Sequence, residues 1–230
     1  MNAVAIITAR GGSKRIPRKN IRKFFDKPII AYSIEKAILS EIFYRVIVST
    51  DDEEIESISK QFGAEVPFIR PIELADDYTG TDEVFIHALK WLNENDRHYD
   101  YACCIYPTAP LLNVDYIKKG FELLKENEAT SAFSVTRYAY PIFRSLKINK
   151  INRLEMLWKE YNETRSQDLP EAYHDAGQFY WVDVKKYLKE KKIFSTDSIP
   201  VIVPRFSVQD IDTMQDWEFA EKMYQIIANA

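Results

Sequence analysis

Short apolar runs alternate with amphipathic stretches along the first two-thirds of the chain. Four apolar runs predict buried strands, at residues 3–9, 45–49, 101–106 and 131–135. Four stretches between and after them predict helices, at residues 28–40, 52–62, 82–95 and 113–127. Strands that alternate with helices of about 10–15 residues are typical of βαβ units. We therefore expect an α/β fold of Rossmann-like type, with a mostly parallel sheet and helices on both faces.

The pattern changes between residues 137 and 169. Aromatic and charged residues mix there without a clear period, and no linker bounds the segment. We expect an insertion of hairpins or loops that packs on the main sheet or on a partner subunit. Strands at 178–182 and 199–203 and a helix at 214–227 then complete a single domain over 1–230.

The helix predicted at 52–62 has sequence signals at both ends. Thr50 or Asp51 precedes it as the candidate N-cap, and acidic residues fill its first turn, where they complement the helix dipole. Gly63 follows the last turn, where a glycine commonly ends a helix.

Composition indicates an ordinary globular protein. Of the 230 residues 46% are hydrophobic and 29% are charged, so the core needs no disulfides. Cys103 and Cys104 are adjacent in an apolar run, and we expect two buried packing residues in a reducing cytoplasm. The sequence opens without a signal-peptide pattern, and no apolar run approaches the ~20 residues of a membrane span. The net charge of −4 disfavours nucleic-acid binding.

Positive charge is concentrated directly after the first predicted strand. Residues 10–22 contain six cations and no acid, although the whole chain is acidic. Gly11 and Gly12, two of only six glycines, lie at the start of this basic loop, where backbone N–H groups can face phosphate oxygens. Because ligands bind at the carboxyl ends of parallel strands, the loop predicts a polyphosphate site. The alternative interpretation is a solvated basic turn that binds no ligand. The loop lacks the spacing of a Walker P-loop and of a dinucleotide fingerprint, which opposes an NAD-dependent oxidoreductase.

Two carboxylates separated by one residue lie before the last predicted helix. In an extended chain Asp210 and Asp212 point the same way and can hold Mg²⁺ against phosphate oxygens. Alternatively, Asp212 or Thr213 caps the helix that follows.

Two further segments carry side chains suited to a polar ligand. Residues 165–178 combine an arginine, a histidine and a glutamine around a glycine, which suits a carboxylated small molecule or, otherwise, a surface loop. Residues 70–81 offer Arg70, Thr79 and Thr81 as contacts for a base or a ribose.

Taken together, these motifs resemble the CMP-sialic acid synthetase family, cytidylyltransferases that activate nine-carbon acidic sugars. The resemblance rests on residues 9–20, 68–75, 107–110 and 210–213, and it covers essentially the whole chain. Residues 49–54, 165–170 and 173–181 most resemble the branch that acts on pseudaminic acid. The resemblance implies a nucleotide-diphospho-sugar transferase fold and a homodimer in which the insertion at 137–169 embraces the neighbouring subunit.

The resemblance also implies a role for each matching residue. The nucleotide CTP would be bound by Ala9, Arg10, Gly12, Ser13, Lys14, Lys19, Asn20, Arg70, Thr79 and Thr81. The acidic sugar would contact Tyr106, Arg165, His174 and Gln178. The cofactor Mg²⁺ would be held by Asp210 and Asp212, and the catalytic residues would be Arg10, Lys14 and Asp212.

The implied reaction transfers CMP from CTP to the anomeric hydroxyl of pseudaminic acid and releases pyrophosphate, for surface glycan or flagellin glycosylation. The sialic acid branch usually has Gln in place of Tyr106 and Arg in place of His174, which argues against sialic acid. Legionaminic, sialic and ketodeoxyoctonic acids remain alternative substrates. A non-catalytic nucleotide-binding homologue is the alternative outside enzymes, and the intact Lys14 and the carboxylate pair oppose it.

Overall fold

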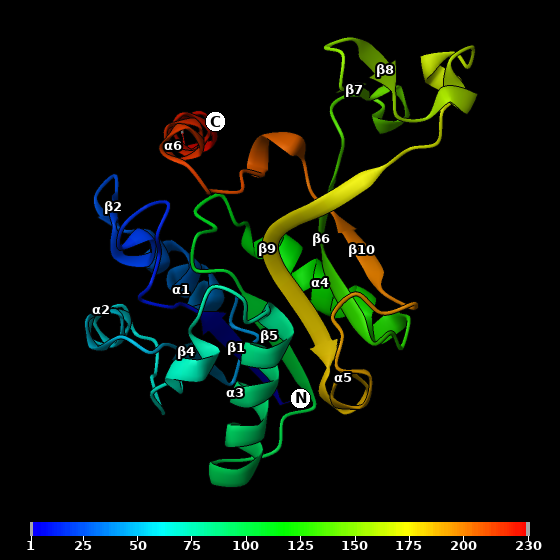
Figure 1. The fold of residues 1–230 in the computed structure, drawn as a ribbon. Helices are drawn as coiled ribbons and strands as arrows, with labels where there is room; N and C mark the ends of the chain where they lie inside the picture. The colour runs from blue at the N-terminus through cyan, green and yellow to red at the C-terminus, as the bar shows by residue number, and fades with distance from the viewer. Residues whose placement is uncertain (1, 229–230) are drawn as a thin grey trace.

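The predicted strands form one six-stranded sheet in the computed structural model, which describes residues 2–228 (Figure 1). Its order is β10-β6-β9-β5-β1-β4. The strands are β1 (Ala3–Thr8), β4 (Arg45–Ser49), β5 (Tyr101–Ile105), β6 (Ser131–Arg137), β9 (Tyr173–Asp183) and β10 (Ile199–Ile202). Strand β1 pairs in parallel with β4 and β5, and β6 pairs in parallel with β10, so the mostly parallel sheet is confirmed. Residues 1 and 229–230 of the expected domain lie outside the described residues.

Helices cover both faces of this sheet, as predicted (Figure 1). They are α1 (Ile29–Leu39), α2 (Glu53–Gln61), α3 (Thr81–Asn95), α4 (Val114–Glu126), α5 (Val184–Glu190) and α6 (Met214–Ala228). Apolar side chains of α1, α2 and α4 join the core on one face, and those of α3 and α5 join the core on the other. Among residues 2–228, no helix has the length and apolar character that crossing a bilayer requires.

Strands β1 and β5 are apolar at nearly every position because both of their faces are buried. In β1, Ala5 and Ile7 belong to one core and Val4 and Ile6 to the other. Cys103 belongs to the first of these cores and Cys104 to the second, and both thiols are free and buried. The prediction that they are packing residues on opposite faces of a strand is therefore confirmed.

Strand β9 differs most from its prediction. Only residues 178–182 were expected, but β9 extends over Tyr173–Asp183 and runs antiparallel between β5 and β6. Its register against β6 shifts, since Phe133 opposes Tyr180 while Val135 opposes Asp175. Gly177 lies within this bulge with a φ of +61°, which glycine tolerates best. The bulge accompanies a strong bend of β9 away from the sheet (Figure 1).

The structure corrects several local predictions. Helix α5 and a short hairpin of β2 (Lys23–Phe24) and β3 (Lys27–Pro28) were not expected. A separate apolar cluster joins this hairpin to α6 through Phe24, Tyr32 and Trp217. The N-cap of α2 is Asp52 rather than Thr50 or Asp51, because the Asp52 carboxylate accepts hydrogen bonds from the backbone at the start of the helix.

The insertion between β6 and β9 stands apart from the main sheet (Figure 1). It contains the hairpin of β7 (Leu146–Ile148) and β8 (Leu154–Met156) and three short 3-10 turns, η3 (Ile142–Arg144), η4 (Lys159–Tyr161) and η5 (Ser166–Asp168). Packing on the main sheet, one of the two expectations for this segment, is therefore wrong. Several of its apolar side chains are exposed, among them Ile148 and Leu154 at 70% each.

Candidate active site

A cleft opens where β1 and β5 end, and the basic loop forms one of its walls. The cavity measures about 220 Å³. The basic loop lines it with the predicted residues Arg10, Ser13, Lys14, Lys19 and Asn20. The opposite segments line it with the predicted residues Arg70, Thr79, Thr81 and Tyr106. Parts of the chain as distant as Arg10 and Tyr106 therefore meet at the edge of the sheet where a ligand was expected.

Sequence reasoning missed several residues of the cleft wall. These are Thr8, Arg15, Ile16, Gly80, Val84, Pro107 and Thr108. Each lies within a few positions of a predicted residue, and Pro107 and Thr108 belong to the motif at 107–110. The motif at 107–110 could have indicated Pro107 and Thr108, but the folded chain is needed to show which residues of the motif face the cavity.

The two glycines of the basic loop serve different purposes. The Gly11 N–H donates a hydrogen bond to Asp51 Oδ1 at 3.0 Å, so the fold itself uses this donor. A Cβ at Gly11 would lie 2.5 Å from Asp52 Oδ2, which explains why only glycine fits. A Cβ at Gly12 would meet nothing within 4 Å. The expectation that both glycines offer their N–H groups to a phosphate is therefore wrong for Gly11.

Carboxylates of the same chain neutralise most of the loop's cations. The ion pairs are Arg10 and Lys14 with Asp77, Arg15 and Lys19 with Asp212, and Arg18 with Asp52 and Glu54. The sixth cation, Arg22, lies over the ring of Trp217 at 5.6 Å from its centroid. Four carboxylates distant in the chain thus pair with five of the six cations and offset most of the loop's positive charge.

Arg18 has a structural role. Its two terminal nitrogens donate to the Asp52 carboxylate at 2.5 and 2.9 Å, a bidentate geometry that favours a strong ion pair. This contact raises the pKa of Arg18 and holds the pKa of Asp52 below its usual range. Since Asp52 also caps α2, the pair fastens the basic loop to the start of that helix.

Arg70 is a buried cation beside the cleft, with only 4% of its surface exposed. Its guanidinium donates to Ser49 Oγ at 3.1 Å and to the Ser49 carbonyl oxygen, which are both neutral acceptors. Burial lowers its pKa to about 10, so the group stays charged at neutral pH. Within residues 2–228 no carboxylate forms an ion pair with it. A buried charge with so little compensation is costly and points to a ligand-binding role.

Tyr106 connects the cleft to the bulge of β9. Its hydroxyl is hydrogen bonded to Thr81 Oγ1 at 2.8 Å, at the start of α3. Its ring lies 5.1 Å from that of Tyr180, whose hydroxyl donates to Asp175 Oδ2 at 2.6 Å. Burial raises the pKa of Tyr106, which keeps it a neutral hydrogen-bonding group.

Of the two capping alternatives for the last helix, Thr213 is confirmed and Asp212 is wrong. Thr213 Oγ1 accepts a hydrogen bond from the Asp216 N–H at 3.2 Å, and the Asp216 carboxylate accepts from the Thr213 N–H at 2.8 Å. This reciprocal pair caps α6. The carboxylate of Asp212 is therefore not engaged at the helix end.

Asp212 and Asp210 instead lie beside the basic loop. The Asp212 carboxylate is 2.5 Å from Arg15 Nη1 and 3.6 Å from Lys19 Nζ. Partial desolvation and the negative charge of Asp212 raise the pKa of Asp210 above its usual range. Two like charges held this close favour a cation between or beside them.

Two predicted ligand-binding residues are used inside the fold. Ala9 is fully buried, and its N–H donates to the Ser49 carbonyl oxygen at 3.0 Å. Gln178 is buried, and its Nε2 donates to the Ser207 carbonyl oxygen at 2.5 Å. Neither side chain lines the cleft.

Two predicted sugar contacts lie toward the insertion. Arg165 Nε donates to Asp168 Oδ2 at 2.6 Å within the inserted segment. His174 Nδ1 is 2.8 Å from the Asp175 carbonyl oxygen, and its ring lies 4.8 Å from that of Tyr138. A single subunit therefore gathers most of the predicted nucleotide contacts, without Ala9 and Gly12, whereas of the predicted sugar contacts only Tyr106 lines the cleft.

Known proteins resemble this chain over nearly its whole length. A family model described as Cytidylyltransferase matches residues 4–226. A pseudaminic acid cytidylyltransferase of Campylobacter jejuni is 46% identical over 226 residues, which cover 98% of this chain and 97% of that protein. A CMP-N,N'-diacetyllegionaminic acid synthase of Legionella pneumophila is 30% identical, with 98% and 97% covered. A solved structure of CMP:2-keto-3-deoxy-manno-octonic acid synthetase complexed with CTP covers 100% of this chain and 99% of its own, with a TM-score of 0.68 and 16% identity, which confirms the fold.

Replacing Arg70 should weaken ligand binding and leave the stability of the fold nearly unchanged. In Arg70→Met we expect the affinity for CTP to fall at least about tenfold, because a charged donor to the ligand is lost. The free energy of unfolding should stay within about 1 kcal/mol, because the buried charge is removed together with its desolvation cost. Calorimetric titration and urea unfolding measure the two quantities.

Arg45→Met is the matched control, since Arg45 pairs with Glu65 and Asp96 away from the cleft. It should lose stability and keep its CTP affinity. An equal loss of CTP affinity in both variants would contradict the assignment of Arg70.

Proposed function

The chain belongs to the cytidylyltransferase family, and from this premise we propose that it transfers CMP from CTP to pseudaminic acid and releases pyrophosphate. The observation that carries the proposal is the cleft in which Arg10, Lys14 and Arg70 meet at the carboxyl ends of β1 and β5. The choice of sugar rests on sequence similarity, which is much higher to the pseudaminic acid enzyme than to the legionaminic acid enzyme.

In the proposed reaction the anomeric hydroxyl of the sugar attacks the α-phosphorus of CTP in line. A bond forms between the sugar oxygen and this phosphorus, the bond to the β-phosphate oxygen breaks, and the hydroxyl proton is released. The protein contributes mainly positioning and charge neutralisation in such a transfer. Arg10 and Lys14 hold the phosphates and stabilise the charge that grows on the departing pyrophosphate.

The cytidine lies on the opposite wall in this proposal. Arg70 uses two guanidinium nitrogens on Ser49, which leaves further N–H donors for acceptors of the nucleoside. Thr79 and Thr81 line the same wall at the start of α3. The hydrogen bond between Thr81 and Tyr106 fixes both side chains at the boundary between nucleotide and sugar.

Asp210 and Asp212 fit a magnesium ion. Within residues 2–228 there is no group of three His, Cys, Asp or Glu residues suited to a metal. A magnesium ion at this place would therefore have only these two carboxylates as protein ligands. Magnesium typically takes one or two carboxylates and completes its shell with water and phosphate oxygens. When bound, it supplies charge neutralisation at the phosphates. Arg15 and Lys19, which pair with Asp212 in this structure, would then be available to the phosphates.

We further propose a homodimer in which the insertion at 137–169 contacts the neighbouring subunit. The insertion stands apart from its own sheet and exposes apolar side chains, including Ile148 and Leu154 (Figure 1). Such side chains favour burial against a partner. Arg165 lies on the same insertion, so a partner subunit is what would bring it to a cleft. We place the enzyme in the cytoplasm, where the free thiols of Cys103 and Cys104 stay reduced.

A pyrophosphate-release assay with CTP, Mg²⁺ and a panel of sugar acids tests the function. Pseudaminic acid should give the highest turnover, above legionaminic, sialic and ketodeoxyoctonic acids. In Lys14→Ala turnover should fall at least about a hundredfold, because a preorganised charge at the reacting phosphates is lost.

The control for Lys14→Ala is Lys23→Ala, which removes an exposed lysine that does not line the cleft. It should retain normal turnover. Turnover on sialic acid but not on pseudaminic acid would overturn the choice of sugar, and normal turnover of Lys14→Ala would overturn its role.

Asp212→Asn should raise the Mg²⁺ concentration needed for half-maximal activity by about tenfold or more, because an amide oxygen is a weaker ligand than a carboxylate. The Mg²⁺ titration of turnover measures this. The control is Asp216→Asn, which alters the cap of α6. It should lower the stability of the protein without a comparable rise in the Mg²⁺ concentration needed for half-maximal activity. An unchanged titration in Asp212→Asn would contradict the metal assignment.

Ile148→Asp should shift the protein from dimer to monomer in sedimentation velocity, because a charge would replace an apolar side chain at the proposed interface. Lys150→Asp alters an exposed residue of the same hairpin and should leave the dimer intact. A natural chain that sediments as a monomer at all concentrations would exclude the proposed assembly.

A further inference from the structure

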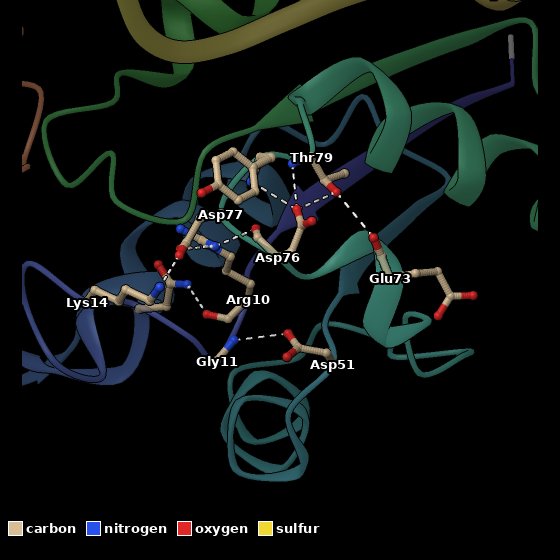
Figure 2. A network of polar contacts seen from close by, with 10 residues as sticks. Arg10, Gly11, Lys14, Asp51, Glu73, Asp76, Asp77 and Thr79 are labelled. Atoms are coloured by element: carbon tan, nitrogen blue, oxygen red, sulfur yellow. Dashed lines mark hydrogen bonds and ion pairs between the residues drawn. The ribbon is translucent and has the colours of Figure 1, made fainter.

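One carboxylate, that of Asp77, contacts both cations of the proposed phosphate site (Figure 2). Arg10 Nη1 donates to Asp77 Oδ1 at 2.8 Å, and Lys14 Nζ pairs with Oδ2. Hydrogen bonds from Lys14 and Arg10 hold the pKa of Asp77 below its usual range, so it is negatively charged at neutral pH. Asp77 thus presents two anionic oxygens to the nitrogens that a phosphate would contact.

The segment that carries Asp77 keeps its shape through its own contacts. The Asp76 carboxylate accepts hydrogen bonds from the Tyr78 N–H at 2.9 Å, the Thr79 N–H at 2.7 Å and Thr79 Oγ1 at 2.7 Å. Tyr78, at the tip, is 93% exposed. Besides the two ion pairs of Asp77, one further hydrogen bond joins this segment to the basic loop among the described residues. In it, Arg10 Nη1 donates to the Asp76 carbonyl oxygen at 2.5 Å. The segment can therefore move away from the loop without losing its internal turn.

Phosphate and carboxylate oxygens compete for the same donors, because both fit the planar fork of arginine and the ammonium of lysine. Asp77 is about one-third exposed, at 32%, and Lys14 at 79% is more so. Ion pairs this exposed contribute little to stability because solvent screens them, so a ligand of higher charge can displace the carboxylate. The cavity of about 220 Å³ is also smaller than the ~300–1,000 Å³ of typical ligand pockets.

We propose that Asp77 is a specificity-determining residue that competes with the ligand's phosphates for Arg10 and Lys14. The inference rests on the proposed function, because it takes these two cations as the phosphate site. A ligand must then carry several negative charges to replace Asp77, which favours a triphosphate over singly charged anions. When pyrophosphate leaves, the Asp77 carboxylate returns to the same nitrogens, so it weakens the binding of this product.

The test is the affinity for inorganic pyrophosphate, measured by calorimetric titration at low ionic strength. Asp77→Asn keeps the size of the side chain and removes its charge. We expect pyrophosphate to bind about three- to tenfold more tightly to this variant, since two exposed ion pairs no longer compete with it. CTP should bind more tightly by a similar factor.

The matched control is Glu73→Gln. It changes the net charge by the same amount on the 3-10 turn η2 (Ile72–Leu74), just before the Asp77 segment. The Glu73 side chain points away from Arg10 and Lys14 (Figure 2). The control should change the affinity for pyrophosphate less than twofold. Thermal unfolding of both variants checks that the fold is retained.

The outcomes separate this inference from the proposed function. Equal pyrophosphate affinity in Asp77→Asn and Glu73→Gln, or weaker binding in Asp77→Asn, overturns the competing role of Asp77. Turnover of CTP by the natural chain would still support the proposed function in that case. If the natural chain binds neither CTP nor pyrophosphate, both the proposed function and this inference are wrong.

Discussion

Ion pairs between the basic loop and carboxylates from three other segments are the interaction on which the cleft depends. Six cations within 13 residues repel one another. Asp52, Asp77 and Asp212 pair with five of them from separate directions, and Arg22 lies over the ring of Trp217. The pairs are not equivalent, because the bidentate contact of Arg18 fastens the loop, whereas those of Arg10, Lys14 and Arg15 lie where a ligand would enter.

The sheet makes this convergence possible. Strands β1, β4 and β5 are parallel neighbours, so the residues that follow them meet at one edge. Asp52 follows β4, Tyr106 follows β5, and the basic loop follows β1. Both faces of these strands are buried under helices, so close packing on each face holds the strands in position. The rigid core thus fixes where each loop begins, and electrostatics fixes how the loops face one another.

The two halves of the proposed site have different structural origins. The nucleotide half is built by loops at the carboxyl ends of strands within one subunit. Of the residues suggested for the sugar, Tyr106 lines the cleft, whereas His174 and Gln178 lie on β9 and Arg165, on the insertion, pairs with its neighbour Asp168. In the proposed function, nucleotide binding therefore depends on the sheet and its loops, whereas sugar recognition depends mainly on the segments that extend from the sheet.

Local patterns in the sequence predict the alternation of strands and helices, the burial of both sheet faces and the position of the basic loop, because periodicity and local composition are properties of neighbouring residues. Arg70, Thr79 and Thr81 are predicted from a motif and its resemblance to a family, not from periodicity or charge. The antiparallel pairing of β9 and the partner of each cation are visible only in the folded chain. Arg18 and Asp52 are 34 residues apart, and Lys19 reaches the carbonyl of Ile211 across 192 residues. Such contacts follow from the path of the whole chain, which no local pattern contains.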